Sequence, residues 1–180
     1  MLLVNRATDR GDLKGTANAN LQFDSLNQST KLVDFGTGGY LDILSGFNTS
    51  SASSWEIGAH IKLPSRVNNT DQVIARWWSS NSSYWNGLFW NMSNGFIWRC
   101  YNASSYSSGI LDTYIYTPNG NYWIPTVGVE YYIKFGWNGS TYYCYIATDK
   151  NFNNITARYT TSSTTKTWGN GKLTYANEPN

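Results

Sequence analysis

The stretch Glu130–Thr148 reads EYYIKFGWNGSTYYCYIAT, and it decides the fold because two runs of strand-forming residues flank an Asn-Gly pair. Asn138-Gly139 between alternating runs is the strongest short-range signal for a tight hairpin, since both residues accept positive φ. A two-residue turn at this pair predicts one face with the pairs Trp137–Ser140, Phe135–Tyr142, Ile133–Cys144 and Tyr131–Ile146. The opposite face would hold the pairs Gly136–Thr141, Lys134–Tyr143, Tyr132–Tyr145 and Glu130–Ala147.

The two faces of this hairpin differ in chemistry, because alternate side chains of a strand point to opposite sides. The apolar face, which must be covered, holds Ile133, Phe135, Cys144 and Ile146. The other face carries three tyrosines, Tyr132, Tyr143 and Tyr145, around one lysine and one glutamate. Amphipathic tyrosines on an open sheet face favour the binding of a flat, polar ligand, and a sugar is the leading candidate.

The composition has few charged residues and is typical of β-proteins outside the cell or on virions. Of the 180 residues, 17% are aromatic and only 13% are charged, about half of the ~25% that is usual for soluble domains. Ser, Thr, Asn and Gly take the place of charges, which is typical of extracellular and virion proteins, so we expect a location on a virion surface or outside the cell. The net charge of +2 comes from scattered basic residues, which argues against nucleic acid as a partner.

We expect no insertion into a membrane, because no apolar stretch approaches the ~20 residues that span a bilayer. Met1-Leu2-Leu3-Val4 is too short for the core of a signal peptide. Either the protein is not exported by that route or the chain is a piece of a longer one. The ending Asn177-Glu178-Pro179-Asn180 favours a piece.

The chain divides into a polar N-terminal arm or linker (residues 1–30), one β-domain (residues 31–176) and a tail (residues 177–180). Further strands are expected at residues 32–35, 40–43, 55–63, 73–78, 110–116, 122–124, 155–160 and 172–175. No segment of ten or more residues shows a helical stripe. Many short strands with Gly/Asn turns predict an all-β fold: a two-sheet antiparallel β-sandwich of the jelly-roll kind.

A second pair, Asn94-Gly95, predicts another hairpin between Leu88 and Tyr101. A two-residue turn there gives one face with Met92–Ile97, Trp90–Arg99 and Leu88–Tyr101, and another with Phe89–Cys100, Asn91–Trp98 and Phe96. We expect the second face, with Phe89, Phe96, Trp98 and Cys100, to be buried. The alternative would bury Arg99, which is costly without a partner. Trp90 would then lie beside Arg99 on an accessible face, a suitable cation–π geometry.

Four segments, in order, resemble the laminin-G-like, concanavalin-A-like family. They are Val33–Ile43 (VDFGTGGYLDI), Trp55–Lys62 (WEIGAHIK), Gln72–Arg76 (QVIAR) and Val127–Tyr142 (VGVEYYIKFGWNGSTY). The resemblance covers residues 32–176 and implies a jelly roll. Its Ser/Asn/Tyr-rich texture, with Ala147-Thr148-Asp149, is similar to that of bacteriophage tail and capsid-decoration proteins, which implies adsorption to host-surface polysaccharide. The family's closing strand, which pairs with the first, is not evident after Gly171.

Related jelly rolls include glucanases, but we expect no enzyme here. A retaining glycosidase needs two carboxyl groups about 5–5.5 Å apart, and the glucanase relatives use a Glu-x-Asp-x-Glu run that this chain lacks. The aspartates stand singly at strand ends or turns, where Asp usually bonds its own backbone. Convergence of Glu130 with Glu56 from separate strands remains the alternative.

Other catalytic and metal sites find little support. The single histidine, His60, is expected to face solvent on its strand, away from any nucleophile. No Cys/His cluster has zinc spacing. Cys144 is expected to be a buried small hydrophobe, while a disulfide to Cys100 is left open. The resemblance allows Ca²⁺ between loops, with Asp71, Asp112 and Asp149 as candidates, but it assigns no cofactor.

The expected ligand-binding surface combines residues of both hairpins with a rim of loop aromatics. A pyranose ring has an apolar face and a belt of hydroxyls, and Tyr and Trp satisfy both at a low cost in entropy. The candidates are Trp90, Arg99, Tyr101, Tyr132, Lys134, Tyr143 and Tyr145, with Trp78, Tyr84, Trp85 and Tyr106 at the rim. Trp77 and Trp98 are expected in the core. The alternative is a protein interface, with sister subunits of a homotrimer or other virion proteins as partners.

Overall fold

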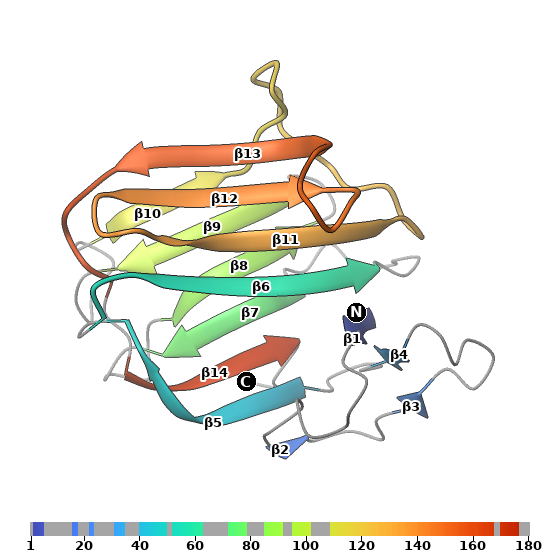
Figure 1. Ribbon diagram of the computed structural model, residues 1–180, viewed down its shortest axis with the longest axis horizontal. Helices are drawn as coiled ribbons and strands as arrows, with labels where there is room; N and C mark the ends of the chain where they lie inside the picture. The colour runs from blue at the N-terminus through green and yellow to red at the C-terminus, as the bar shows by residue number, and fades with distance from the viewer. Residues whose placement is uncertain are drawn as a thin grey trace.

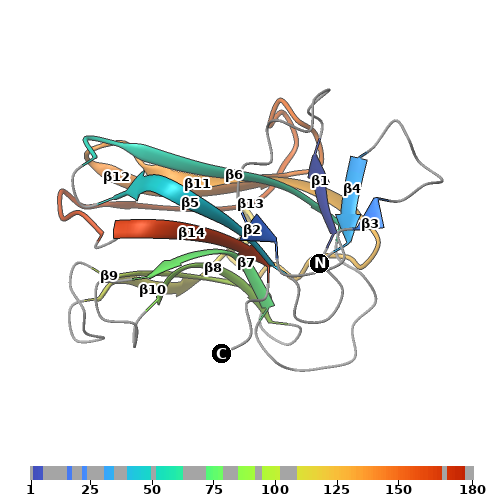
Figure 2. The same ribbon diagram turned by 90° about the horizontal axis from the view of Figure 1, so that it is seen from below.

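The computed structural model describes residues 2–5, 16–17, 22–23, 31–34, 40–49, 52–62, 72–78, 85–91, 95–101, 109–167 and 170–176. Every regular element in these residues is a β-strand, and the strands form two antiparallel sheets. The sheets stack as two layers (Figures 1 and 2). The fold is therefore an all-β, two-sheet antiparallel sandwich, as the sequence predicts.

The first sheet, which we call sheet A, has the strand order β13-β12-β11-β6-β1-β4-β3. Its strands are β1 (Leu2–Asn5), β3 (Gln22–Phe23), β4 (Lys31–Asp34), β6 (Trp55–Lys62), β11 (Glu130–Trp137), β12 (Thr141–Ala147) and β13 (Ile155–Ser162). The hairpin within residues 130–148 forms β11 and β12, next to β6 near the middle of this sheet (Figure 1).

The second sheet, sheet B, has the order β10-β9-β8-β7-β14-β5-β2. Its strands are β2 (Thr16–Ala17), β5 (Tyr40–Asn48), β7 (Gln72–Trp78), β8 (Trp85–Asn91), β9 (Gly95–Tyr101), β10 (Gly109–Tyr114) and β14 (Asn170–Ala176). The strand β14 pairs with both β5 and β7. The strand predicted at residues 172–175 is therefore present, and it lies in sheet B between two strands from earlier in the chain.

Parts of residues 1–30, the segment predicted to be an arm or linker, take part in both sheets. The strand β1 pairs with β4 and β6, and β3 pairs with β4, all in sheet A. The strand β2 pairs with β5 in sheet B. The division of the chain at residue 31 stays a prediction.

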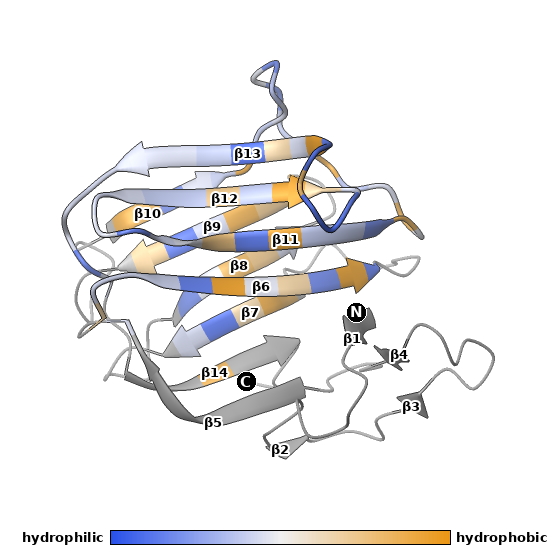
Figure 3. Ribbon diagram, in the orientation of Figure 1, coloured by the Kyte–Doolittle hydropathy of each residue, from blue (hydrophilic) through white to orange (hydrophobic). Residues whose placement is uncertain are grey.

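The alternation of side chains along the strands explains why two layers form. In β6, apolar and polar residues alternate (Figure 3), and the apolar set, which includes Ile57 and Ile61, is buried in the core between the sheets. Aromatic rings join the layers: the ring centres of Trp55 (sheet A) and Trp77 (sheet B) lie 5.1 Å apart, and those of Phe135 and Trp98 lie 5.7 Å apart. Edge-to-face packing of this kind adds to the burial of the rings. Trp77 and Trp98 are core residues, as predicted.

The hairpin β11–β12 has the predicted faces but a different register. Trp137 pairs with Tyr142 and Phe135 with Cys144, two positions away from the predicted partners. The turn is centred on Gly139-Ser140, one residue later than predicted, with Gly139 at φ 101°. The side-chain oxygen of Asn138 accepts hydrogen bonds from the backbone N–H groups of Ser140 and Thr141. A shift by two keeps every side chain on its predicted face, so the apolar face is buried.

The hairpin β8–β9 differs in a way that changes its faces. Trp90 pairs with Phe96, so the predicted two-residue turn at Asn94-Gly95 is wrong. The register differs by three, an odd number, which moves side chains to the other face. Trp90 is consequently a core residue, 2% exposed, and the prediction that it is accessible beside Arg99 is wrong. Leu88 is buried with it in the same core.

Phe89 lies on the opposite side from the other predicted core residues of this hairpin. Phe96, Trp98 and Cys100 belong to the central core, whereas Phe89 packs with Val73 and Ile97 in a separate cluster. Both cysteines are buried and free, Cys100 in sheet B and Cys144 in sheet A. Burial raises the pKa of each thiol well above its ordinary value. Cys144 is thus the buried small hydrophobe that the sequence predicts.

Candidate functional site

The candidate site is the outer face of β6, β11, β12 and β13, which we call the outer face of sheet A. Residues that pair directly across strands project to the same side of a sheet. The pairing places Lys134 between Gly58 of β6 and Tyr145 of β12, and Tyr145 beside Arg158 of β13. Two residues further along β11, Gly136 lies between Glu56 and Tyr143.

Tyr143 is held by a contact that spans three strands. Its hydroxyl donates a 2.7 Å hydrogen bond to Oε2 of Glu56. The ring can take this path because Gly136, on the strand between them, has no side chain; a Cβ there would lie 3.1 Å from the Tyr143 hydroxyl. Two effects raise the pKa of Tyr143 well above its ordinary value: burial is the larger, and the hydrogen bond to the Glu56 carboxylate is the second. Tyr143 therefore stays protonated and acts as a donor.

Lys134 is positioned by two aromatic rings. Its Nζ lies 4.4 Å from the ring centre of Phe152 and 5.7 Å from that of Tyr145, both within the ~6 Å range of cation–π contacts. Tyr145 in turn stacks on Tyr143, with ring centres 5.6 Å apart. Lys134, Tyr143 and Tyr145, all predicted site residues, are therefore together on this face.

Phe152 is not among the predicted site residues, and the loop that presents it is tightly organised. The residue has φ 57°, a conformation that non-glycine residues rarely adopt. The Asp149 carboxylate accepts hydrogen bonds from the backbone N–H groups of Asn151, Asn153 and Asn154. These hydrogen bonds lower the pKa of Asp149, and the bond from Asn154 has the largest effect. Asp149 therefore organises its own loop, which is the ordinary role of Asp at a turn.

Tyr132, another predicted site residue, covers His60. The two rings stack with centres 3.9 Å apart, and His60 Nε2 lies 3.0 Å from Oε2 of Glu130. His60 is on the outer side, as predicted, but it is only 8% exposed, so the prediction that it faces solvent is wrong. The alternation along β6 predicts the side of the sheet on which His60 lies. It does not predict the burial of His60, because the covering ring of Tyr132 comes from a different strand, β11.

The outer face continues beyond β13 through residues that the sequence pattern does not single out. Tyr116 forms isolated antiparallel bridges with both Arg158 and Tyr122, and the backbone N–H of Arg158 donates to the Tyr116 carbonyl over 2.9 Å. The rings of Tyr116 and Tyr122 stack at 5.4 Å, and Tyr122 is 55% exposed. The turn between them is the yellow loop above β13 in Figure 1. Only the spacing of these tyrosines around Pro118-Asn119-Gly120 could have drawn attention to them.

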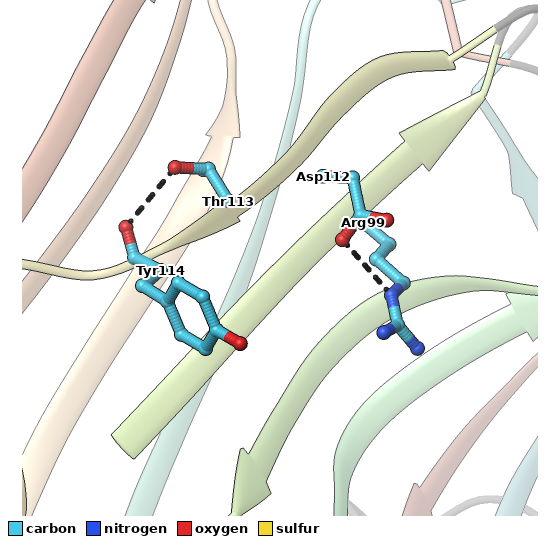
Figure 4. A network of polar contacts seen from close by, with 4 residues as sticks. All are labelled: Arg99, Asp112, Thr113 and Tyr114. Carbon is cyan, nitrogen blue, oxygen red and sulfur yellow. Dashed lines mark hydrogen bonds and ion pairs between the residues drawn. The ribbon is translucent and has the colours of Figure 1, made fainter. Parts of the chain in front are cut away.

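Arg99 belongs to the other layer. Its Nε lies 3.0 Å from Oδ1 of Asp112 on the neighbouring strand β10 (Figure 4). The same view shows the Thr113 hydroxyl donating to the carbonyl of Tyr114 over 3.3 Å. Arg99 in sheet B and the tyrosines of sheet A therefore do not form one surface. Asp112, a calcium candidate, is engaged in this ion pair.

The remaining predicted residues have no described side chains. Trp78, Trp85 and Tyr101 are placed by their backbone at strand ends of sheet B. Tyr84, Tyr106 and the calcium candidate Asp71 lie outside the described residues.

The two glutamates of the described strands on the outer face, Glu56 and Glu130, do not converge. Glu130 pairs with Lys62, whereas Glu56 pairs with Gly136, which lies six residues beyond Glu130 on β11. At about 3.3 Å per residue this separation is roughly 20 Å, much more than the ~5–5.5 Å of a retaining glycosidase pair. The alternative convergence of Glu130 with Glu56 is thus wrong. In the described part of the chain, no group of three or more His, Cys, Asp or Glu could hold a metal ion.

Comparison of the chain with protein-family models, curated proteins and solved structures found no match. Among the residues that the structure describes, no helix is long and apolar enough to span a membrane.

Proposed function

We propose that this chain is a non-catalytic glycan-binding domain whose ligand lies on the outer face of sheet A. The observation that carries the proposal is the grouping of Tyr132, Lys134, Tyr143 and Tyr145 on adjacent strands of one face. These side chains offer flat apolar rings together with hydroxyl and ammonium donors, which is what a pyranose ring requires.

The arrangement is suited to binding because its side chains are already held in place. Tyr143 is fixed by Glu56, Lys134 by two rings and Tyr132 by His60. A ligand would therefore avoid most of the ~0.5–1.5 kcal/mol that ordering a side chain at an interface costs. Sites on strands are also positioned more precisely than sites on loops.

The resemblance of residues 32–176 to the concanavalin-A-like family extends the proposal. We place the domain in a virion surface protein of a bacteriophage, such as a tail fibre, receptor-binding or capsid-decoration protein. Its partner there is the polysaccharide of the host surface. The low share of charged residues and the abundance of Ser, Thr and Asn support this location.

A protein interface is the second candidate, because tyrosine and arginine are also enriched where proteins associate. The outer face would then contact a sister subunit, as in a homotrimer, or another virion protein. This candidate is favoured by the exposure of Tyr122, 55%, and of Ile124, 53%, two large side chains in the segment that extends this face beyond β13.

The test is retention of the purified protein on immobilised host-surface polysaccharides, followed for wild type and for Tyr145→Ala. Val127→Ala, an exposed position in the segment before β11, is the control. We expect Tyr145→Ala to lose most retention while Val127→Ala keeps it. Sedimentation of the same variants tests the second candidate: a change of oligomeric state with unchanged retention would overturn glycan binding. Release of reducing sugar would instead indicate an enzyme.

A further inference from the structure

We infer that the ligand is an acidic polysaccharide that crosses the strands along the row Lys134–Tyr145–Arg158–Tyr116–Tyr122. This inference rests on the proposed function and adds the charge and the direction of the glycan. We call these residues the cross-strand row.

The register of the strands places Lys134, Tyr145 and Arg158 on the outer face of sheet A. Isolated bridges continue the row past β13 to Tyr116 and Tyr122, where the ring centre of Tyr122 also lies 4.8 Å from that of Tyr114 in sheet B. Lys134 pairs with Tyr145, Tyr145 with Arg158, Arg158 with Tyr116, and Tyr116 with Tyr122. Neighbouring strands lie about 4.8 Å apart, so the four steps span roughly 19 Å. Aromatic rings and cations alternate over most of this length. A linear chain of sugar rings could therefore contact rings and charges in turn.

The charge of the row favours an acidic ligand. Within the described residues, no carboxylate lies within ion-pairing distance of Lys134 or Arg158. The two glutamates of the same face are engaged elsewhere, Glu56 by Tyr143 and Glu130 by His60. The cations of the row are thus not neutralised by their own face. A guanidinium binds a carboxylate through two parallel hydrogen bonds, and such charge-assisted bonds are the stronger ones.

The exposure of the row favours an extended ligand over a single sugar. Arg158 is exposed, Tyr122 is 55% exposed, and Lys134 and Tyr145 are half-buried. Tyr122 is the fourth step away from Lys134, so only a ligand of several sugar rings can contact both ends. Loss of Tyr122 should therefore weaken the binding of long chains more than that of short ones.

The experiment compares polygalacturonic acid with its carboxyl-reduced, uncharged counterpart by isothermal titration calorimetry. We expect wild type to bind the acidic polymer about tenfold more tightly than the reduced one. Arg158→Gln should weaken binding of the acidic polymer about tenfold, the effect of losing one charge-assisted contact. The matched control is Arg99→Gln, on the other sheet, which should leave binding unchanged. Near-ultraviolet circular dichroism confirms that each variant is folded.

The outcomes separate this inference from the proposed function. Equal binding of the two polymers, or equal losses for Arg158→Gln and Arg99→Gln, would overturn the acidic row while leaving glycan binding intact. Equal effects of Tyr122→Ala on short and long oligosaccharides would overturn the direction of the ligand. Tight binding of single-stranded DNA in place of either polymer would overturn both, as would absence of binding to any saccharide.

Discussion

Replacement of Gly136 by alanine tests how the outer face is built. A Cβ at this position would overlap the carbonyl oxygen of Trp55 and lie 3.0 Å from Cα of Glu56. Both are backbone atoms of β6, so they cannot rotate away, and β6 and β11 must separate locally. The same Cβ would crowd the Tyr143 hydroxyl at 3.1 Å and disturb its bond to Glu56.

The expected cost of Gly136→Ala follows from these distances. Overpacking usually costs about 1–3 kcal/mol, and contact with backbone places this substitution at about 3 kcal/mol. For a domain of this size, each kcal/mol lowers the melting temperature by roughly 2–4 °C, so we expect a fall of about 6–12 °C. The free energy of unfolding is measured by urea denaturation with the slope m compared between variants.

Gly58→Ala is the matched control, because Gly58 lies on the same face of the neighbouring strand. Its added Cβ would meet nothing nearer than the Ile133 carbonyl oxygen at 3.7 Å, an ordinary contact. We expect a change within about 0.5 kcal/mol, as for other surface positions. Equal effects of the two substitutions would refute the account of how β6, β11 and Tyr143 fit together.

Three further substitutions probe the loop, the core and the site. Asp149→Asn should loosen the loop and release the Phe152 ring from Lys134, seen as a change in the Phe152 ring signals by nuclear magnetic resonance; unchanged signals would contradict the role of the carboxylate. Because the pKa of Asp149 is lowered in the folded state, its contribution is fully present above the ordinary value of about 3.9 and is lost as the pH falls through the lower, folded-state pKa, so acid should reproduce the variant's spectrum. Trp90→Ala should lower the free energy of unfolding by about 3–5 kcal/mol, as for other buried aromatics. A loss as small as that of a surface substitution, measured by denaturation, would instead indicate that Trp90 is accessible to a ligand. Tyr143→Phe should weaken saccharide binding without unfolding, whereas unchanged calorimetric affinity would remove its hydroxyl from the site.

The sequence predicts the faces of β11–β12 correctly because the alternation there is strong and the error in register is even. The turn is misplaced by one residue because the Asn138 side chain bonds the backbone N–H groups of Ser140 and Thr141. Gly139 alone then takes the positive φ. A side-chain cap of this kind leaves no periodic signal.

The same Asn-Gly rule predicts the faces of β8–β9 wrongly, because the predicted register there differs from the observed one by three residues, an odd number. Gly95 lies at the start of β9 with φ 77°, and a Cβ there would overlap the Trp123 carbonyl oxygen. This glycine is required by a close approach of distant backbone, which the local sequence does not reveal. The rule therefore assigns Trp90 to the wrong face.

Contacts between distant segments account for the other differences. His60 is buried because Tyr132 and Glu130 of β11 cover it. Tyr116 and Arg158 are 42 positions apart in the sequence and become neighbours only through the bridge at the edge of β13. A pattern within one segment cannot predict either arrangement.

The most direct test of the account is a nuclear magnetic resonance titration of the protein with an oligosaccharide of polygalacturonic acid. We predict that the largest shifts occur at Lys134, Tyr145 and Arg158, while the core residue Trp98 and the sheet B residue Arg99 change little. Shifts confined to sheet B, with the outer face of sheet A unchanged, would contradict glycan binding at the outer face.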